Sequence, residues 1–301
     1  MLLEGNSLKK ISEVSSNSIQ AVITSPPYWG LRNYDNDEQL GQESSPEKFV
    51  ANLTKLFSKI KRVLKEDGTV WVNIGDTYFG PKGGHYDKNS ITNSSTGNEY
   101  RQKRAAPPEH LYLKNGDLSG VPWKFAFEMQ KQGWYLKQDI IWHKPNPMPE
   151  AVTDRCVKSH EHIFLLSLKP RYYFDHEAIQ EKAKYKGDNR ASRGDSRRDI
   201  SLAASMAADS QPTGEYRNKR DVWSMNTASS KEAHFAVFPE DLPALCIKAG
   251  SKEGDTVLDP FMGSGTTALI AQKLGRKWVG IELNPKYIEI IKRRPAQSEL
   301  F

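Results

Sequence analysis

The chain has 301 residues, 27% of them charged, and a mean hydropathy of −0.67, which suits a soluble protein with one large α/β domain or two small ones. Apolar runs such as HIFLLSL are about seven residues long, far short of the roughly 20 that span a bilayer, and MLLEGNSLKK lacks the pattern of a signal peptide, so we expect a cytoplasmic protein without membrane contact. The net charge of +6 is weak evidence for a polyanionic partner, and the isolated cysteines Cys156 and Cys246 argue against a disulfide framework or a metal site.

The N-terminal part of the chain alternates apolar strands with an amphipathic helix. SIQAVI (18–23) has the composition of a buried strand, and TVWVNIGD (69–76) has that of a second one. Between them, residues 45–68 are expected to form one long helix with Ser45 as its N-cap and Gly68 at its exit. A strand, a crossover helix and another strand predict a parallel sheet.

The same alternation resumes after an interruption. Residues 81–117 are rich in Gly, Asn and Ser and have no period, so we expect a long mobile loop there. The elements expected beyond it are a helix at 121–133, strands at 135–144 and 161–169 near the far edge of the sheet, a helix at 238–250, a strand at 255–261, a helix at 265–275, a strand at 277–283 and a helix at 284–294.

A basic stretch separates the two groups of elements. Residues 182–220 contain ten Lys or Arg and five Asp or Glu, with little apolar material. Such a stretch is either a solvated surface loop or a surface that contacts nucleic acid.

A glycine turn near the C-terminus indicates a nucleotide-type ligand. In LDPFMGSGTTA, Gly263 and Gly265 allow a sharp strand-to-helix turn and a close approach of the backbone to a ligand. Asp259 precedes the turn, and Glu282 ends the next strand, where its carboxylate suits two ribose hydroxyls. Ala268 replaces the third glycine of the phosphate-binding pattern, which favours an adenosine without phosphates. The alternative is a purely structural turn.

A rigid corner follows the first strand. In TSPPYW (24–29), two prolines end the strand at about Thr24, because proline has no N–H for the sheet ladder. By itself, this segment could be a stiff loop packed by aromatic side chains.

Together the two segments resemble a known family. DPFMGSGTT is similar to the S-adenosylmethionine motif, and TSPPYW to the catalytic motif, of amino-group DNA methyltransferases. The catalytic motif comes first, as in the circularly permuted β group. The resemblance extends over about 1–80, 118–175 and 233–294, through blocks such as DIIWHKPNPMPEAV and SHEHIFLLSLKPRYYFD. It implies an open, mostly parallel, doubly wound sheet: the Rossmann-like class I methyltransferase fold, permuted, with an inserted recognition region.

The resemblance also implies a division of the chain. Residues 1–175 would form the catalytic half, including the loop 81–117, and residues 233–301 the half that binds S-adenosyl-L-methionine. The insertion 176–232, with its basic residues, would recognise double-stranded DNA. The arginines expected to bind DNA are Arg190, Arg193, Arg197 and Arg198.

Site residues follow from matching the two motifs. The residues expected to bind the cofactor are Phe238, Asp259, Phe261, Gly263, Ser264, Gly265, Thr266 and Glu282. The residues expected to be catalytic are Ser25, Pro26, Pro27 and Tyr28. A base flipped out of the duplex would stack on Tyr28, while Ser25 Oγ and a rigidly held carbonyl accept hydrogens from its amine. We expect Trp29 to be a packing residue and the three edge-strand histidines, His143, His160 and His162, to be structural.

The target amine and the partners are finer questions. Serine at position 25 is typical of N4-cytosine members, whereas N6-adenine members usually carry Asp or Asn, so N4-cytosine is favoured and N6-adenine is the alternative. C5-cytosine methylation is disfavoured, because neither cysteine follows a proline as the usual nucleophile does. An RNA or protein amino-methyltransferase and a catalytically dead DNA-binding module are further alternatives. A cognate restriction endonuclease is a possible partner, and the sequence leaves open a monomer or a homodimer.

Overall fold

The computed structural model describes residues 1–31, 36, 38–80, 110–183, 215–227 and 238–293. Its helices are α1 (Ser7–Lys10), α2 (Pro46–Val63), α3 (Val121–Lys131), α5 (Asp241–Gly250), α6 (Thr266–Lys273) and α7 (Pro285–Arg293), with 3-10 helices η1 (Ile11–Glu13) and η2 (Glu177–Ile179). Its strands are β1 (Leu2–Glu4), β2 (Ile19–Thr24), β3 (Leu64–Ile74), β4 (Tyr135–His143), β5 (His160–Ser167), β6 (Glu181–Lys182), β7 (Tyr216–Arg217), β8 (Val222–Ser224), β9 (Thr256–Asp259) and β10 (Lys277–Glu282). None of the helices in these ranges is long and apolar enough to cross a membrane.

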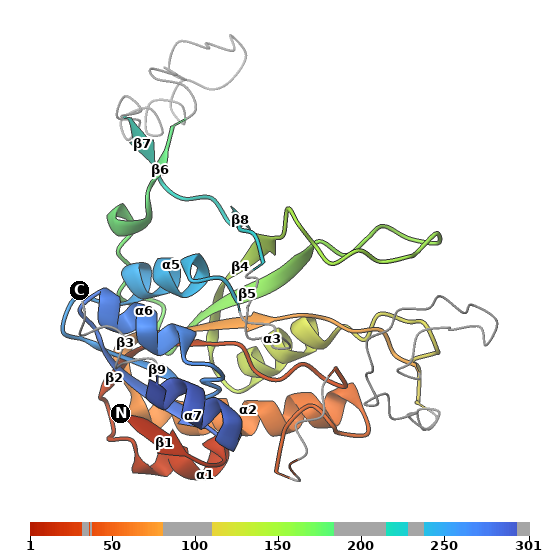
Figure 1. Ribbon diagram of the computed structural model, residues 1–301, viewed down its shortest axis with the longest axis horizontal. Helices are drawn as coiled ribbons and strands as arrows, with labels where there is room; N and C mark the ends of the chain where they lie inside the picture. The colour runs from red at the N-terminus through yellow and green to blue at the C-terminus, as the bar shows by residue number, and fades with distance from the viewer. Residues whose placement is uncertain (32–35, 37, 81–109, 184–214, 228–237, 294–301) are drawn as a thin grey trace, which may run out of the picture.

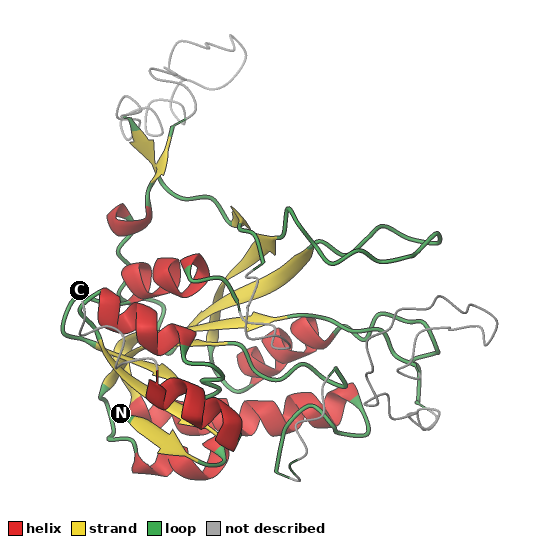
Figure 2. Cartoon of the chain, in the orientation of Figure 1, coloured by secondary structure: helices red, strands yellow, loops and turns green. Residues whose placement is uncertain are grey.

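The main sheet has eight strands in the order β1-β10-β9-β2-β3-β5-β4-β8 (Figures 1 and 2). The first five strands in this order are parallel, β5 is antiparallel to both of its neighbours, and β8 is parallel to β4. The expected open, mostly parallel α/β sheet is confirmed, and β4 and β5 lie toward its far edge as predicted. The short strand β1, which the sequence analysis missed, forms the opposite edge beside β10.

Helices cover both faces of the sheet. Successive residues of β3 point to opposite sides, so Val70 and Val72 join the core beneath α2 and α3, whereas Trp71 joins the core beneath α5 and α6. Figure 1 shows the same arrangement, with α2 and α3 on one side of the strands and α5 and α6 on the other. A parallel sheet buried on both faces leaves its strand ends as the place for a ligand.

The helix expected over 45–68 is shorter in the structure. α2 ends at Val63, and Leu64 is already extended and starts β3. Gly68 lies inside β3 beside a register irregularity, where a Cβ atom would come within 2.9 Å of the Gln20 carbonyl oxygen. The glycine therefore marks a close approach of two strands instead of a helix exit.

The interrupting segments are described only in part. Of the expected loop 81–117, residues 81–109 lie outside the described residues. Leu118, the residue after this loop, forms an isolated β-bridge with Tyr78. Of the range 176–232, the structure describes 176–183 and 215–227, which include the small β6–β7 pair and the edge strand β8. Part of the region expected to recognise DNA is thus joined to the main sheet.

Candidate active site

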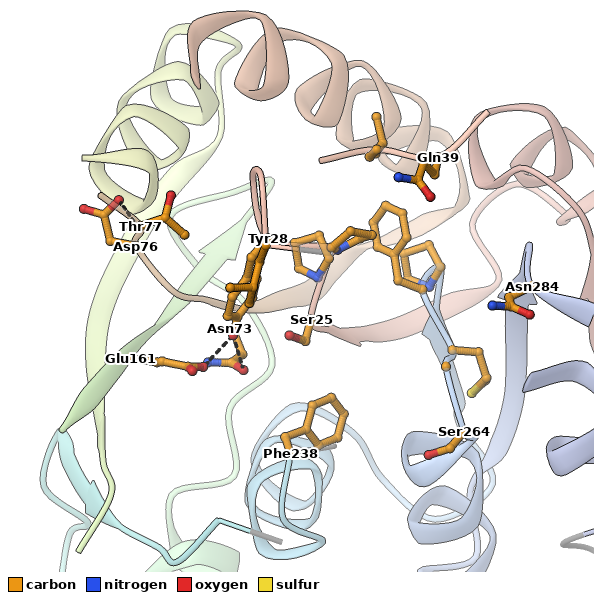
Figure 3. Close-up of a pocket in the computed structure, with 18 of the residues that line it drawn as sticks. Ser25, Tyr28, Gln39, Asn73, Asp76, Thr77, Glu161, Phe238, Ser264 and Asn284 are labelled. Atoms are coloured by element: carbon orange, nitrogen blue, oxygen red, sulfur yellow. Dashed lines mark hydrogen bonds between the residues drawn. The ribbon is translucent and has the colours of Figure 1, made fainter. Parts of the chain in front are cut away.

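One cavity of about 1920 Å³ opens at the carboxyl ends of the parallel strands. Its walls come from the loops after β2, β9 and β10, because the ends of parallel strands meet at one edge. Most of the residues expected to be catalytic or to bind the cofactor line it: Ser25, Pro26, Pro27, Tyr28, Phe238, Phe261, Gly263, Ser264, Thr266 and Glu282. Figure 3 shows Ser25, Phe238 and Ser264 around the same space. Asp259 and Gly265 are not among the lining residues.

Asp259 holds the two motifs together from below the cavity. Its side chain is buried and accepts hydrogen bonds from Thr24 Oγ1 at 2.7 Å, Thr267 Oγ1 at 2.7 Å and the Phe261 N–H at 3.0 Å. Burial raises its pKa to about 6, against the opposing effect of these hydrogen bonds. The carboxylate thus fixes the glycine turn relative to β2, and a direct role in holding a ribose does not follow from its position.

The turn itself depends on backbone that favours glycine. Gly263 has φ 54° and Gly265 has φ 85°, both in the left-handed region, and the Gly265 N–H bonds the Met262 carbonyl at 3.0 Å. Gly265 is the N-cap of α6, so the turn presents the start of that helix to the cavity. Gly265 therefore shapes the site, whereas Gly263, Ser264 and Thr266 line it.

Glu282 is a buried acceptor at the end of β10. Its carboxylate accepts the Gly263 N–H at 2.6 Å and the Asn284 N–H at 2.7 Å. Burial raises its pKa to about 7. The backbone N–H groups lower this pKa, and the nearby Asp259 carboxyl raises it further. An ionised carboxylate has about four acceptor positions, so about two remain for a ligand after these two bonds. Beside it, the buried Ser264 hydroxyl has no hydrogen-bond partner within the part of the chain that the structure describes.

Tyr28 lies at the other end of the cavity. Its hydroxyl donates to Glu161 Oε2 at 2.5 Å and lies 3.2 Å from Asn73 Oδ1. Figure 3 shows the ring directed toward these two side chains. The ring also lies against Gly75, where a Cβ atom would come within 2.7 Å of Tyr28 Cε2. Trp29, in contrast, is buried and stacks on Phe79, as expected of a packing residue.

Several polar residues of the cavity were not singled out from the sequence. They are Asn73, Asp76, Lys144, Glu161 and Asn284. Asp76 accepts the N–H groups of Gly120 and Val121, and so caps α3. The available signal was position, because four of these residues lie near or just beyond the carboxyl end of an apolar strand, and Glu161 lies at the start of one.

The remaining expectations concern histidines and cysteines. His162 contacts Asp139, and His143 contacts Ser224, whereas His160 lines the cavity and has its pKa lowered by burial. Both cysteines are free, Cys156 exposed and Cys246 buried. Within the described ranges, no group of three or more His, Cys, Asp or Glu side chains could hold a metal ion. The arginines expected to bind DNA, Arg190, Arg193, Arg197 and Arg198, lie outside the described residues.

Comparison with known proteins gives the family. Residues 19–293 match the N6_N4_Mtase family, DNA methylase. The type II methyltransferase M.Cfr9I of Citrobacter freundii is 43% identical over 293 residues, which cover 97% of this chain and 86% of the relative.

Solved structures share the fold. The PvuII DNA methyltransferase (cytosine-N4-specific) has a TM-score of 0.64 at 19% identity, and the match covers 97% of this chain and 84% of that one. A protein from Thermus thermophilus in complex with S-adenosyl-L-methionine has a TM-score of 0.58 at 22% identity, covering 98% and 93%. The family match from residue 19 to residue 293, together with the identity to M.Cfr9I, shows that this chain belongs to the N6_N4_Mtase family of DNA methylases.

Proposed function

We propose that this protein transfers a methyl group from S-adenosyl-L-methionine to the exocyclic N4 amine of a cytosine flipped out of duplex DNA. The observation that carries the proposal is one cavity lined by the Ser25–Tyr28 corner, the turn around Gly263 and the carboxylate of Glu282. A methyl donor at the turn and a base at the corner would share this space, as direct transfer requires.

The turn side of the cavity fits an adenosine that carries no phosphate. Ionised Glu282 keeps acceptor positions for two ribose hydroxyls, and Ser264 offers a buried hydroxyl without a partner among the described residues. Phe238 and Phe261 line the same cavity and supply apolar surface for adenine. When bound, S-adenosyl-L-methionine supplies a methyl group on a positively charged sulfur, which is its own leaving group.

The corner side fits a flipped base. Ser25 Oγ and the backbone carbonyl of Ser25 or Pro26 would accept the two hydrogens of the exocyclic amine, and the prolines hold that carbonyl in place. These bonds favour a tetrahedral nitrogen whose lone pair is no longer delocalised into the ring. The nitrogen would take the methyl carbon from the sulfur of the cofactor, the sulfur would keep the bonding electron pair, and the surplus proton of the nitrogen would pass to water. No general base with a tuned pKa is needed for this step.

Cytosine is favoured over adenine by Ser25. In the permuted β group that the motifs resemble, serine at this position is typical of N4-cytosine members, and Asp or Asn of N6-adenine members. The chain order, with TSPPYW before DPFMGSGTT, supports membership of that permuted group. The cytosine-N4 specificity in the name of the PvuII neighbour points the same way. N6-adenine remains the alternative.

The DNA partner and the biological setting belong to the same proposal. Double-stranded DNA is the substrate, with Arg190, Arg193, Arg197 and Arg198 of the basic stretch contacting it. The type II name of M.Cfr9I supports a restriction-modification setting, in which a nuclease cuts the same unmethylated site.

A single assay tests the proposal. Purified protein is incubated with tritiated S-adenosyl-L-methionine and either unmethylated genomic DNA or total RNA, and the products are digested to nucleosides and separated. We expect label only in N4-methyldeoxycytidine. Label in N6-methyldeoxyadenosine would show that adenine is the target base, and label in RNA would show that RNA is the substrate. Cofactor binding without any transfer would identify a dead binding module.

A further inference from the structure

We propose that Glu161 is a positioning residue that sets the orientation of the Tyr28 ring, and with it the angle at which a flipped base is presented to the methyl donor. This inference rests on the proposed function, because it deepens the role of the base-stacking corner. It concerns a strand, β5, that contributes neither of the two motifs.

The evidence is a set of contacts that meet on one carboxylate. Glu161 Oε2 accepts the Tyr28 hydroxyl at 2.5 Å and the Asn73 side-chain amide at 3.0 Å, while Oε1 pairs with the Lys144 ammonium. These donors come from the loop after β2, from β3 and from the residue after β4. Glu161 thus joins three neighbouring segments at the rim of the cavity, as the dashed contacts in Figure 3 show in part.

The antiparallel direction of β5 explains how the carboxylate reaches this place. β5 begins at His160, so its first residues lie at the edge where the parallel strands end. Asn73 pairs in register with Ile163 of β5, and its amide also donates to the His162 carbonyl at 3.3 Å. Glu161 is therefore held by the sheet, and the Tyr28 hydroxyl is held by a rigid partner.

The ring is fixed at two points. Its hydroxyl lies 2.5 Å from Glu161 Oε2 and 3.2 Å from Asn73 Oδ1, and its Cε2 edge packs against Gly75, where a Cβ atom would come within 2.7 Å. A tyrosine has two side-chain torsions, so a hydrogen bond at the tip and a contact along the edge determine the orientation of the ring. Tyr28 also lines the cavity, where a flipped base would stack on its ring.

Positioning suits this carboxylate better than proton removal. Three donors already occupy its two oxygens, and the ammonium of Lys144, which lies 4.4 Å over the Trp142 ring, balances its charge. Hydrogen bonds to a charged partner are also stronger than neutral ones, which favours a single ring orientation.

The test compares four proteins: wild type, Tyr28→Phe, Glu161→Gln and the double variant. The readouts are kcat and KM for methyl transfer to unmethylated genomic DNA, the affinity for S-adenosyl-L-methionine by calorimetry, the Tm and the pH profile of kcat. Asp139→Asn is the matched control, because Asp139 pairs with His162 on the same edge of the sheet and does not line the cavity.

We expect Tyr28→Phe and Glu161→Gln each to lower kcat on the order of 10- to 100-fold, with cofactor affinity and Tm close to wild type and the pH profile unchanged in shape. The double variant should be no worse than the more severe single variant, because both act on one contact: Tyr28→Phe removes the hydroxyl, and Glu161→Gln replaces its charged acceptor by a neutral amide. Asp139→Asn should keep kcat within about twofold.

Three results would overturn the inference: single variants with kcat within twofold of wild type, effects that multiply in the double variant, or parallel losses of Tm and cofactor affinity. Tyr28→Phe removes only a hydroxyl, so it gives an answer even if Glu161→Gln fails to fold. A wild-type protein that transfers no methyl to DNA would instead refute the proposed function.

Discussion

Thr24 Oγ1 donates a 2.7 Å hydrogen bond to Asp259 Oδ1, and both groups are buried. Thr24 is the residue before the Ser25–Tyr28 corner, and Asp259 is the residue that ends β9 before the glycine turn. The same carboxylate binds Thr267 in α6 and the Phe261 N–H in the turn. One side chain therefore sets the distance between the place proposed for the base and the place proposed for the methyl donor.

Removing this bond should affect both stability and catalysis. Thr24→Val keeps the shape but leaves a buried acceptor with one donor fewer, which should cost about 1–3 kcal/mol in the free energy of unfolding. Turnover should fall further than stability alone explains, because the two halves of the cavity lose their link. Thr54→Val is the control, since the Thr54 hydroxyl is also buried but bonds only within α2. Denaturant unfolding and kcat measure the two effects, and equal kcat in the two variants would refute the linking role.

Cofactor affinity should depend on pH through Glu282. The pKa of Glu282 in the folded protein is about 7, above its usual value, so without cofactor its carboxyl group stays protonated up to about pH 7. The stability that this group contributes is present at low pH and is lost as pH rises through about 7. The ionised form is the better acceptor for ribose hydroxyls, so affinity for S-adenosyl-L-methionine should rise about tenfold from pH 6 to pH 8. Calorimetry at several pH values measures it, and Glu282→Gln should be weaker and flat. A flat wild-type profile would exclude Glu282 as the ribose acceptor.

Gly265 and Gly254 form a matched pair for the glycine turn. Both have a left-handed φ, 85° and 84°, but Gly254 has open space around it and lies away from the cavity. Gly265→Ala and Gly254→Ala should each cost about 1–3 kcal/mol of stability through backbone strain. Only Gly265→Ala should also weaken cofactor binding, because its new methyl group also meets Ile291 and displaces the turn. Equal cofactor affinity in both variants would show that the turn does not hold the cofactor.

The basic stretch offers a test of DNA recognition. Replacing Arg197 and Arg198 by alanine should weaken DNA binding and flatten its salt dependence by roughly 0.9 log unit for each phosphate that is no longer neutralised. Cofactor affinity should stay unchanged. Titrations at several salt concentrations measure the slope. If both arginines can be replaced without effect, while deletion of residues 81–100 abolishes site choice, recognition lies in that other segment.

Local sequence patterns predicted the parts of the site that lie within one turn of chain. The corner at Pro26 and Pro27 and the turn at Gly263 follow from the backbone limits of proline and glycine, and strand order then brings both to one edge of the sheet. The same reasoning misplaced Gly68, because a glycine after a helical pattern also fits a strand irregularity. Only the pairing with β2 decides between the two.

Contacts between distant strands could not be predicted in this way. Asp259 was expected to face the cofactor, but the burial of its carboxylate against Thr24 and Thr267 depends on how β2, β9 and α6 pack. Tyr28 was expected to stack on the base, but the bond of its hydroxyl to Glu161 depends on β5 running antiparallel to its neighbours. Periodicity reports which face of a strand is buried, and it does not report the direction of the next strand.

The pairing of β1 with β10 has a consequence for synthesis of the chain on the ribosome. Leu2 lies beside Gly280, and β2 lies between β3 and β9, so the Ser25–Tyr28 corner has no complete sheet around it until the last third of the chain has been made. Such distant pairings are slow to form, because much chain entropy is lost before the stabilising contacts between the strands are made. A truncated translation product that lacks β9 and β10 retains the corner but cannot form the cavity. Methylation activity therefore arises only after nearly all of the polypeptide has been synthesised.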